Sequence, residues 1–543
     1  MTVDEIKNFY PQFSIRNILK KNKKEYMVYI FAKLFQILLL VIIPGILSMF
    51  IDRIENGELG ISGNVIYFFI LAIFEFFITI VVNELNVRLS NRIAFQIEYN
   101  TIGRIKHVPY VLVKDYDDAY LAQRINNDAV IIGDYIVEQF PYFISDALFV
   151  FLIIILTFSI NISIGILIVA FIVLYLVLYF TTRKLVYKQG GDMFEAQGNF
   201  FAMLSNQFLN ILSIKVNSWY KETDLEFAKI VTVFFDRSVK YLRTINTIAA
   251  ANLLICRMAY GSAIILLGAV IADEALSIGS FVVIIMYIQL LLSKLQSATE
   301  FGRKREEYRV AKHRIEKFDS LKTELNGKIV LNNITEISAQ NIAVKYSSKN
   351  ILDNVSLSLK KGNIYVVRGE NGSGKTTLIN ALLGVLDTAS GTILYDNQEI
   401  SEIDMYSARK TLFSVVTQEP YIYNGTLAEN LIYGSEVSSN PKMDVPIIHD
   451  FLSFFECKEQ KENTYITSKN TSLSGGEKQK ISICRALLKN SDILVFDEPT
   501  NALDSNSIDK LLLYFSEIKA EHIIIVISHN DKVINIADKI IDL

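Results

Sequence analysis

The sequence predicts a chain of two parts, a polytopic α-helical membrane domain of six transmembrane helices fused to an α/β domain. Three observations support this fold class. Of the 543 residues, 51% are hydrophobic, and the apolar content is concentrated before residue 300. From residue 337 the chain alternates β-like runs with helical patterns, which is typical of an α/β domain. A glycine-rich segment near residue 370 joins a β-like run to a helical one.

Six apolar runs account for the first part. Each is about 20 residues long, which is enough to cross roughly 30 Å of hydrocarbon as a helix. Six runs of this length are difficult to reconcile with the core helices of a soluble protein. The expected spans are residues 27–50, 63–83, 141–160, 162–181, 246–271 and 277–297.

The placement of positive charge orients these spans. Lys and Arg are abundant before the first span and in the long segments after the second and fourth spans, whereas the short connections on the other side have few. The positive-inside rule therefore places both termini and both long segments in the cytoplasm. Both long segments have a helical pattern and are expected to extend beyond the bilayer. A formal net charge of −3 provides no basic field, so nucleic acid is not an expected partner.

Shifts in composition give the expected domain boundaries. Three cysteines lie far apart, at Cys256, Cys457 and Cys484, so neither a disulfide framework nor a zinc site is expected. The polar N-terminal segment lacks the apolar region of a cleavable signal peptide. We expect a cytoplasmic N-terminal segment at residues 1–25, a transmembrane domain at 26–300, a charged linker at 301–336 and a nucleotide-binding domain at 337–543.

The glycine-rich segment fits the pattern G-x-x-x-x-G-K-[ST] between a strand and a helix. Glycines let successive backbone N–H groups point inward around phosphate, and the following helix adds the positive end of its dipole. Lys375 is expected to reach the β- and γ-phosphates, and Thr376 to place its hydroxyl on Mg²⁺. The residues expected to bind nucleotide here are Gly369, Asn371, Gly372, Ser373, Gly374, Lys375, Thr376 and Thr377.

Carboxylates and a histidine follow two later strand-like runs. Asp497 and Glu498 end the apolar run that begins at Ile493. Asp497 is expected to hold Mg²⁺, and Glu498 to polarise the attacking water as general base. His529 follows a second apolar run and is expected to sense the γ-phosphate. Gln418, at a strand-to-loop boundary, suits Mg²⁺ or its water.

A second anion cradle precedes another helical run. Ser474, Gly475 and Gly476 stand at the expected start of this helix, where a hydroxyl and free N–H groups favour an anion. One loop already holds a triphosphate. The second cradle therefore suggests that the γ-phosphate bound by one subunit meets Ser474–Gly476 of another.

Together these segments resemble the ATP-binding cassette (ABC) superfamily. Asp504 is similar to the D-loop aspartate, Gln418 to the Q-loop glutamine and His529 to the switch histidine. Tyr346 resembles the A-loop aromatic that stacks on adenine. Glu477 departs from the pattern, which usually has Gln at this position. The matching segments are Gly369–Thr376 for Walker A, Leu473–Glu477 for the signature motif, Ile493–Glu498 for Walker B and Asn501–Asp504 for the D-loop.

Six spans followed by one cassette resemble an exporter half-transporter of the type IV fold, also called the type I exporter fold. The resemblance implies ATP and Mg²⁺ as cofactors and a second copy of the chain as partner in a homodimer. It implies a multi-pass location in the cytoplasmic membrane, and an alternation between inward- and outward-facing states. Val113–Asp128 resembles the first coupling helix, and a second tip, near Asn210–Lys215, is implied to contact the opposite cassette.

The substrate is predicted less directly. The Ile/Lys/Asn-rich sequence and the form of the signature motif resemble exporters of ribosomally made antimicrobial or signalling peptides. Multidrug or lipid export is the alternative. A channel gated by ATP, or a regulatory membrane ATPase, belongs to a different class, and the complete hydrolytic set argues against it.

Polar residues within the spans are candidates for a substrate cavity, since intramembrane charge is costly and often functional. They are Lys33, Glu75, Asn83, Asp146, Asn252, Arg257 and Gln289.

Overall fold

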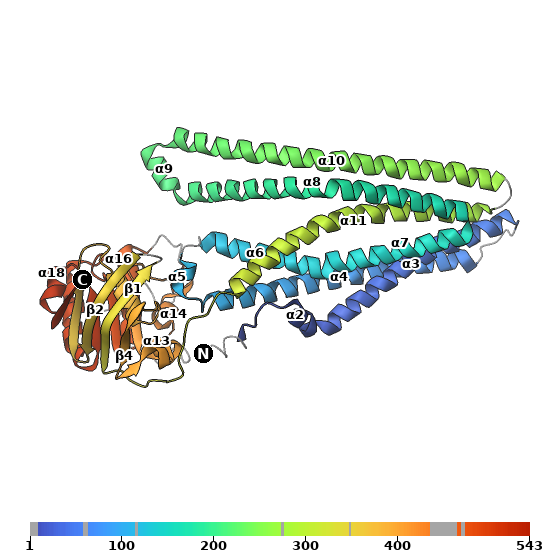
Figure 1. Cartoon of the computed structure of the whole chain (residues 1–543). Helices are drawn as coiled ribbons and strands as arrows, with labels where there is room; N and C mark the ends of the chain where they lie inside the picture. Colours follow the sequence, from blue (N-terminus) through green and yellow to red (C-terminus); the bar gives the residue numbers. More distant parts are fainter. Residues whose placement is uncertain are drawn as a thin grey trace. The chain divides into compact units, whose positions relative to one another are not determined.

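The computed structural model divides into two compact units. We call them the helical unit, which contains the apolar helices, and the cassette unit, which contains the sheets (Figure 1). The helical unit comprises Gln12–Gly103 and Tyr116–Ser320, and the cassette unit comprises Met1–Pro11, Arg104–Asp115 and Leu321–Leu543. The structure describes residues 9–57, 63–114, 118–272, 276–346, 349–434, 464–467 and 473–543.

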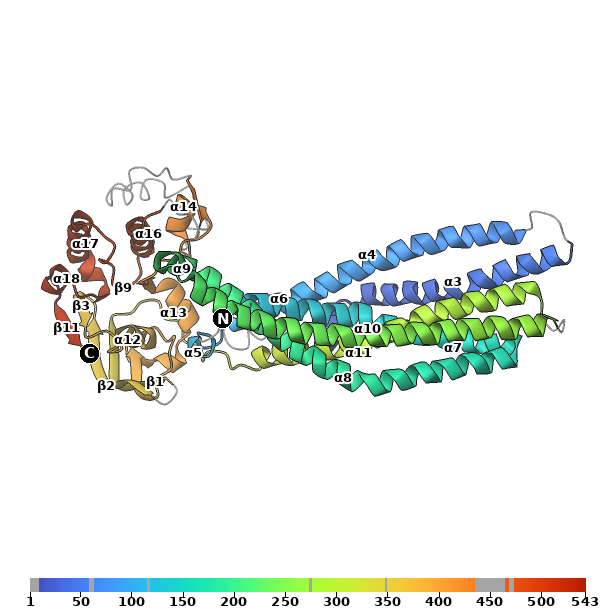
Figure 2. The same ribbon diagram turned by 90° about the horizontal axis from the view of Figure 1, so that it is seen from above.

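The helical unit is built from long helices that lie side by side in both views (Figures 1 and 2). Its buried core joins α3, α7, α8, α10 and α11 through side chains such as Ile37, Phe149 and Ile284. The elements are α2 (Ile15–Lys21), α3 (Lys23–Glu55), α4 (Gly63–Ile105), α6 (Asp118–Asp134), a π-helix η1 (Tyr135–Gln139), α7 (Phe140–Ile160), α8 (Ile162–Leu209), α9 (Ile211–Asn217), α10 (Tyr220–Ala272) and α11 (Ile278–Asp319).

The six expected spans fall in α3, α4, α7, α8, α10 and α11. Five helical stretches of the described residues are long and apolar enough to cross a membrane, and α11 contains a shorter apolar stretch, Ile278–Leu291. Most apolar side chains of α4 face outward, as expected for a surface in contact with lipid.

Helix α11 continues beyond its apolar stretch to Asp319, so the expected boundary at residue 300 lies inside one unbroken helix. Pairs spaced four residues apart support this polar extension, including Arg303 with Glu307 and Lys312 with Glu316. Arg314 also donates through Nε to Asp128 Oδ2 of α6 at 2.7 Å, and its second guanidinium nitrogen contacts the other carboxylate oxygen. The helix therefore replaces the first half of the predicted linker.

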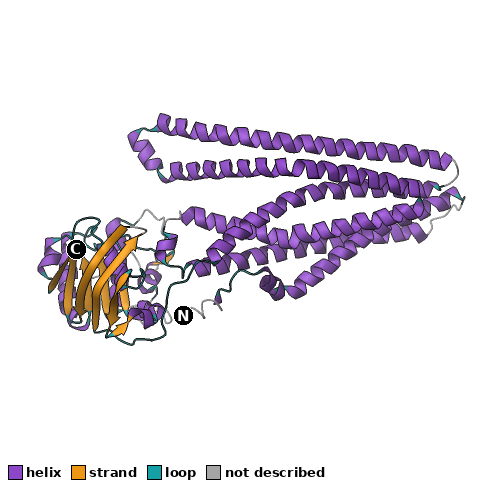
Figure 3. Cartoon of the chain, viewed as in Figure 1, coloured by secondary structure: helices purple, strands orange, loops and turns teal. Residues whose placement is uncertain are grey.

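The cassette unit contains all the strands found in the described residues (Figure 3). A five-stranded parallel sheet has the order β11-β3-β10-β9-β6, an antiparallel sheet has the order β2-β1-β4-β5, and β7 pairs with β8. The strands are β1 (Glu336–Tyr346), β2 (Lys349–Lys360), β3 (Asn363–Arg368), β4 (Ser390–Tyr395), β5 (Gln398–Glu399), β6 (Phe413–Val416), β7 (Gly425–Thr426), β8 (Tyr465–Ile466), β9 (Ile493–Asp497), β10 (Ile523–Ile527) and β11 (Lys539–Asp542).

Helices cover the parallel sheet, whose central strands are continuous apolar runs because both faces are buried. One core lies between this sheet, the antiparallel sheet and α12, and the other lies against α16 and α17. The helices are α5 (Tyr110–Val113), α12 (Lys375–Leu382), α13 (Met405–Thr411), α14 (Leu427–Ile432), α16 (Gly475–Leu488), α17 (Ser505–Ile518) and α18 (Asp531–Asn535), with short 3-10 turns η2 (Ile400–Glu402) and η4 (Lys519–Glu521).

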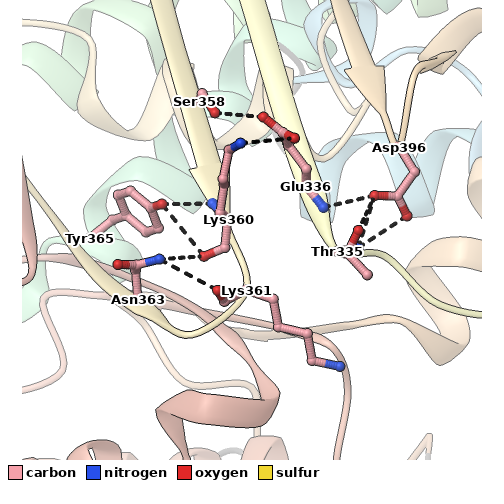
Figure 4. A network of polar contacts seen from close by, with 8 residues as sticks. All are labelled: Thr335, Glu336, Ser358, Lys360, Lys361, Asn363, Tyr365 and Asp396. Atoms are coloured by element: carbon pink, nitrogen blue, oxygen red, sulfur yellow. Dashed lines mark hydrogen bonds and ion pairs between the residues drawn. The ribbon is translucent and has the colours of Figure 1, made fainter.

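A polar network joins the two sheets (Figure 4). The hydroxyl of Tyr365, on the parallel sheet, accepts a hydrogen bond of 2.6 Å from the backbone N–H of Lys360 on β2. Nearby, the Asp396 carboxylate accepts from the N–H groups of Thr335 and Glu336. The Tyr365 contact ties the antiparallel sheet to the strand that leads into the glycine-rich loop, and the Asp396 contacts hold the start of β1 beside the end of β4.

The range expected for the first tip, residues 113–128, includes parts of two helices. The short helix α5 ends at Val113, the first residue of this range. Residues 115–117 lie outside the described residues, and α6 begins at Asp118 in the helical unit. Within the cassette unit, His107 packs edge-on against Tyr406 at 5.3 Å. The second expected tip coincides with α9, which starts at Ile211.

Candidate functional site

The glycine-rich loop begins at the carboxyl end of β3 and ends at the first turn of α12. Gly374 caps α12 with φ of 101°, and a Cβ there would lie 2.7 Å from Leu352 Cδ2. Only glycine fits this conformation and this contact without strain. Lys375 Nζ donates to the carbonyl oxygens of Gly369 at 2.7 Å and Glu370 at 3.1 Å. The ammonium is thus held over the loop whose N–H groups form the cradle.

The register of the parallel sheet brings the acidic residues to this loop. Ile527 of β10 pairs with Asp497 of β9, so both strands end at the same edge. Thr376 Oγ1 donates to Asp497 Oδ2 at 3.2 Å, and His529 Nε2 lies 3.7 Å from Glu498 Oε1. Glu498 has φ of 47°, a left-handed conformation that is uncommon for a non-glycine residue and concentrates at functional sites.

The two carboxyl groups have perturbed acidity. Burial raises the pKa of Asp497, and the Thr376 hydrogen bond and the Lys375 charge oppose this rise. Burial also raises the pKa of Glu498, against the opposing charge of His529. A raised pKa makes Glu498 a stronger base than an exposed glutamate, which suits proton abstraction from water.

A cavity of about 480 Å³ lies at this edge of the sheet. Most of the predicted nucleotide and metal residues line it, as does Asn501 of the expected D-loop, and Ile351 and Ile527 line it without having been predicted. Ile527 ends the apolar run that precedes His529, whereas nothing in the sequence marks Ile351 as a cavity residue. The predicted residues along the cavity wall are Asn371, Gly372, Gly374, Lys375, Thr376, Thr377, Gln418, Asp497, Glu498 and His529.

The signature segment lies outside this cavity's lining. Ser474 caps α16 by accepting from Glu477 N–H at 3.2 Å, and Glu477 Oε2 accepts from Ser474 N–H at 2.7 Å. This reciprocal capping gives Glu477 a clear local role. A Cβ on Gly476 would lie 2.6 Å from Ala502 O, so the signature and D-loop backbones are in close contact. Gly475 and Ser474 are exposed or face open space.

Asp504 and Tyr346 also lie outside the cavity's lining. Asp504 accepts from Ser507 N–H at 2.9 Å and pairs with Lys480 of α16 at 3.1 Å. The Ser507 hydrogen bonds and the Lys480 charge hold the pKa of the Asp504 carboxyl well below its usual range. Tyr346 stands at the end of β1, opposite Lys349, and its side chain lies outside the described residues.

The residues present fit ATP and Mg²⁺. Ser373 Oγ is buried without a hydrogen-bond partner among the described residues, next to the helix N-terminus that favours phosphate. Thr376, Asp497 and Gln418 provide oxygen ligands at one side of the cavity. The described residues contain no cluster of three or more His, Cys, Asp or Glu side chains able to hold a metal. Mg²⁺ suits such a site because it binds few protein groups and retains water and phosphate oxygens.

The polar residues within the spans separate into two sets. Lys33, Asp146 and Asn252 are buried, and Glu75 is half-buried. Exposed positions are taken by Asn83, Arg257 and Gln289.

The fold and the site define an ABC transporter. Residues 26–295 match the family described as the ABC transporter transmembrane region, and residues 352–501 match the family described as ABC transporter. The chain therefore belongs to the ABC transporters, as a multi-pass membrane protein with an ABC ATPase domain.

Known proteins similar to this chain include an Atm1-family exporter and several permease proteins. The structure of a bacterial Atm1-family ABC exporter with ATP bound has a TM-score of 0.80 at 19% identity, over 97% of this chain and 93% of that chain. A probable ABC transporter ATP-binding/permease protein of Haemophilus influenzae is 34% identical over 40% of each chain. An ATP-dependent lipid A-core flippase of Pasteurella multocida is 30% identical over 50% of this chain and 47% of its own length. The chain thus matches less than half the length of these two curated relatives.

Proposed function

We propose that the chain exports an amphipathic substrate across the cytoplasmic membrane, driven by ATP hydrolysis in a homodimer that alternates between inward- and outward-facing states. The observation that carries this proposal is one chain with a membrane domain and a complete hydrolytic set around a single cavity. Channel-like or regulatory ATPases do not require this set, because ATP binding alone can bias a gate.

Each residue of the cavity has a proposed role. Lys375 and the loop N–H groups bind the β- and γ-phosphates, and Thr376, Gln418 and Asp497 hold Mg²⁺. The metal would neutralise the developing phosphate charge when bound. Glu498 orients and deprotonates the attacking water, and its position 3.7 Å from His529 lets the imidazole keep that carboxylate aligned.

The homodimer is proposed from the exposed position of the signature segment. Ser474, Gly475 and Gly476 lie outside the lining of their own cavity, so a second copy would supply them to the γ-phosphate. Asp504 and its pair Lys480 would hold the D-loop beside that segment. Tyr346 is proposed to stack on adenine. Both cassettes would lie in the cytoplasm, on the side indicated by the positive charges.

Two substrate classes are candidates. The sequence favours a ribosomally made antimicrobial or signalling peptide. The relatives that are lipid A-core flippases favour a lipid, which is the second candidate. Both are amphipathic, and both are consistent with apolar helices that bury a few polar side chains.

Reconstituted vesicles test the proposal. We expect an acyl-labelled lipid or a labelled amphipathic peptide to accumulate against its gradient only with ATP and Mg²⁺. The Glu498→Gln variant should bind ATP but neither hydrolyse it nor accumulate the probe. Passive flux that needs bound ATP but no hydrolysis would contradict export and favour a gated channel.

A further inference from the structure

Four helices of the helical unit meet at a buried polar cluster. Lys33 of α3 is 6% exposed, and its Nζ lies 3.5 Å from the centre of the Tyr142 ring of α7. It also donates to Gln36 at 3.1 Å, and Gln36 donates to Thr79 of α4 at 2.8 Å. One turn after Tyr142 on α7, Asp146 pairs with Lys294 of α11 at 3.1 Å. We call Tyr29, Lys33, Tyr142, Asp146 and Lys294 the inner cluster.

An ordinary membrane-anchoring role does not explain Lys33. Lysines near the ends of spans usually extend their ammonium groups toward water. Lys33 instead points into the helix bundle, where burial of an ammonium is costly. Tyr29, one turn earlier on α3, is fully buried, and its hydroxyl has no hydrogen-bond partner among the described residues. Two buried donors therefore lie on one face of α3.

Lys33 has no direct carboxylate partner among the described residues. Two carboxylates, Asp146 and Glu138, act electrostatically on the Lys33 ammonium, and the ammonium of Lys294 acts on it as a like charge. Asp146 pairs with Lys294, and no carboxylate of the described residues forms an ion pair with Lys33. The Tyr142 ring and the Gln36 side-chain oxygen replace only part of the hydration that a lysine ammonium has in water.

We propose that the inner cluster binds the anionic headgroup of a lipid as it enters the transport path, with Lys33 and Tyr29 as the direct donors. This inference rests on the proposed export function and narrows its substrate class. A phosphate or carboxylate between the two donors would give Lys33 a direct anionic partner and would accept a hydrogen bond from the Tyr29 hydroxyl. The cluster lies closed between helices, so binding accompanies the helix separation of the inward-facing state.

The position of the cluster favours a lipid over a peptide. Lys33, Asp146 and Lys294 stand near the span ends that the positive-inside rule assigns to the cytoplasm, close to inner-leaflet headgroups. One turn deeper, Ile37, Phe149 and Leu291 form a buried apolar layer. Acyl chains would suit that layer, whereas the backbone amides of a peptide would remain unsatisfied in it.

Two lipids with identical labelled acyl chains, phosphatidylglycerol and phosphatidylcholine, test the proposal. Each is measured in binding to the full-length protein without ATP and in ATP-driven translocation. The wild type should prefer phosphatidylglycerol in both assays. Lys33→Met should reduce that preference by about tenfold, the scale of one lost charged hydrogen bond. Tyr29→Phe should reduce it less, and Lys33→Arg should retain it. Glu138→Gln should strengthen it, because a nearby negative charge is removed.

Lys24→Met is the matched control, since Lys24 is an exposed lysine of the same helix. It should leave the preference unchanged. Unchanged phosphatidylglycerol preference in folded Lys33→Met would overturn the inference, as would equal handling of both lipids by the wild type. Translocation of an acidic peptide without lipid preference would overturn it in favour of a peptide, while leaving export intact. Loss of all ATP-driven translocation in the wild type would refute export itself, and the binding assay would still decide the role of Lys33.

Discussion

Glu498 combines a left-handed backbone conformation with a half-buried carboxyl group next to an imidazole. Its backbone N–H donates to Ile527 O at 2.9 Å, which anchors the turn at the end of the parallel strands. With this conformation Glu498 lines the cavity, as strained residues at functional sites often do. The acidity of this one group should therefore be visible in the kinetics of the whole protein.

The pH dependence of ATP hydrolysis tests this expectation. Glu498 acts as a base only when ionised, and burial raises its pKa above the ordinary 4.5. Activity should accordingly fall as pH decreases through a value above 4.5. His529 opposes the rise, so His529→Gln should move the acid limb of kcat/KM to higher pH. An acid limb that does not move would contradict the electrostatic contact between the two residues.

Gly476 and Gly475 provide a matched pair of substitutions. A Cβ on Gly476 would meet Ala502 O at 2.6 Å, whereas a Cβ on Gly475 meets nothing within 4 Å. Gly476→Ala should destabilise the protein by about 1–3 kcal/mol, as overpacking does. Gly475→Ala should unfold at nearly the wild-type temperature in a thermal scan of the purified protein. Equal stability of the two variants would contradict the close contact between signature and D-loop.

At the scale of elements, the long helices depend on a few polar contacts where they leave the apolar region. The second half of helix α11 buries Ala311 and Ile315 and stacks Tyr308 on Tyr135. Charged pairs along the helix and the contact with α6 add to this packing. Asp128 is the most buried of these charges, at 1% exposure. The α6–α11 junction is thus the point at which a single change should matter.

Asp128→Ala should destabilise this junction by about 2–3 kcal/mol, because Arg314 loses a two-point carboxylate partner in a partly buried site. Glu306→Ala is the control, since Glu306 pairs with the exposed Arg309, and exposed pairs contribute about 0–1 kcal/mol. Hydrogen exchange of α6 and the end of α11 should increase in the first variant only. Similar exchange in both variants would show that the junction does not depend on this pair.

At the scale of the whole molecule, the proposed homodimer makes a prediction about which residues share a site. A subunit carrying both Lys375→Ala and Ser474→Arg, paired with a wild-type subunit, would damage both composite sites. Placing Lys375→Ala on one subunit and Ser474→Arg on the other would damage one site twice and leave the other intact. ATPase activity of the two purified mixed dimers should therefore be lower in the first arrangement. The reverse order would indicate that each subunit completes its own site.

The sequence by itself determined the chemistry of the cassette and the number of apolar runs. Lys375, Asp497 and Glu498 are encoded in short stretches whose strand and helix patterns are local. Their places at the start of a helix and the end of a strand therefore followed from the adjacent residues. The membrane spans followed from hydropathy, which depends only on composition within a window.

Tertiary structure decided what depends on contacts between distant segments. It showed that α11 continues to Asp319, that α5 ends and α6 begins within the range expected for the first tip, and that Ile351 and Ile527 line the cavity. It also joined Lys33, Asp146 and Lys294, which come from three helices separated by more than a hundred residues. No local sequence pattern predicts this contact between the three residues, because it depends on how the long helices pack against one another and not on the neighbouring residues in the sequence.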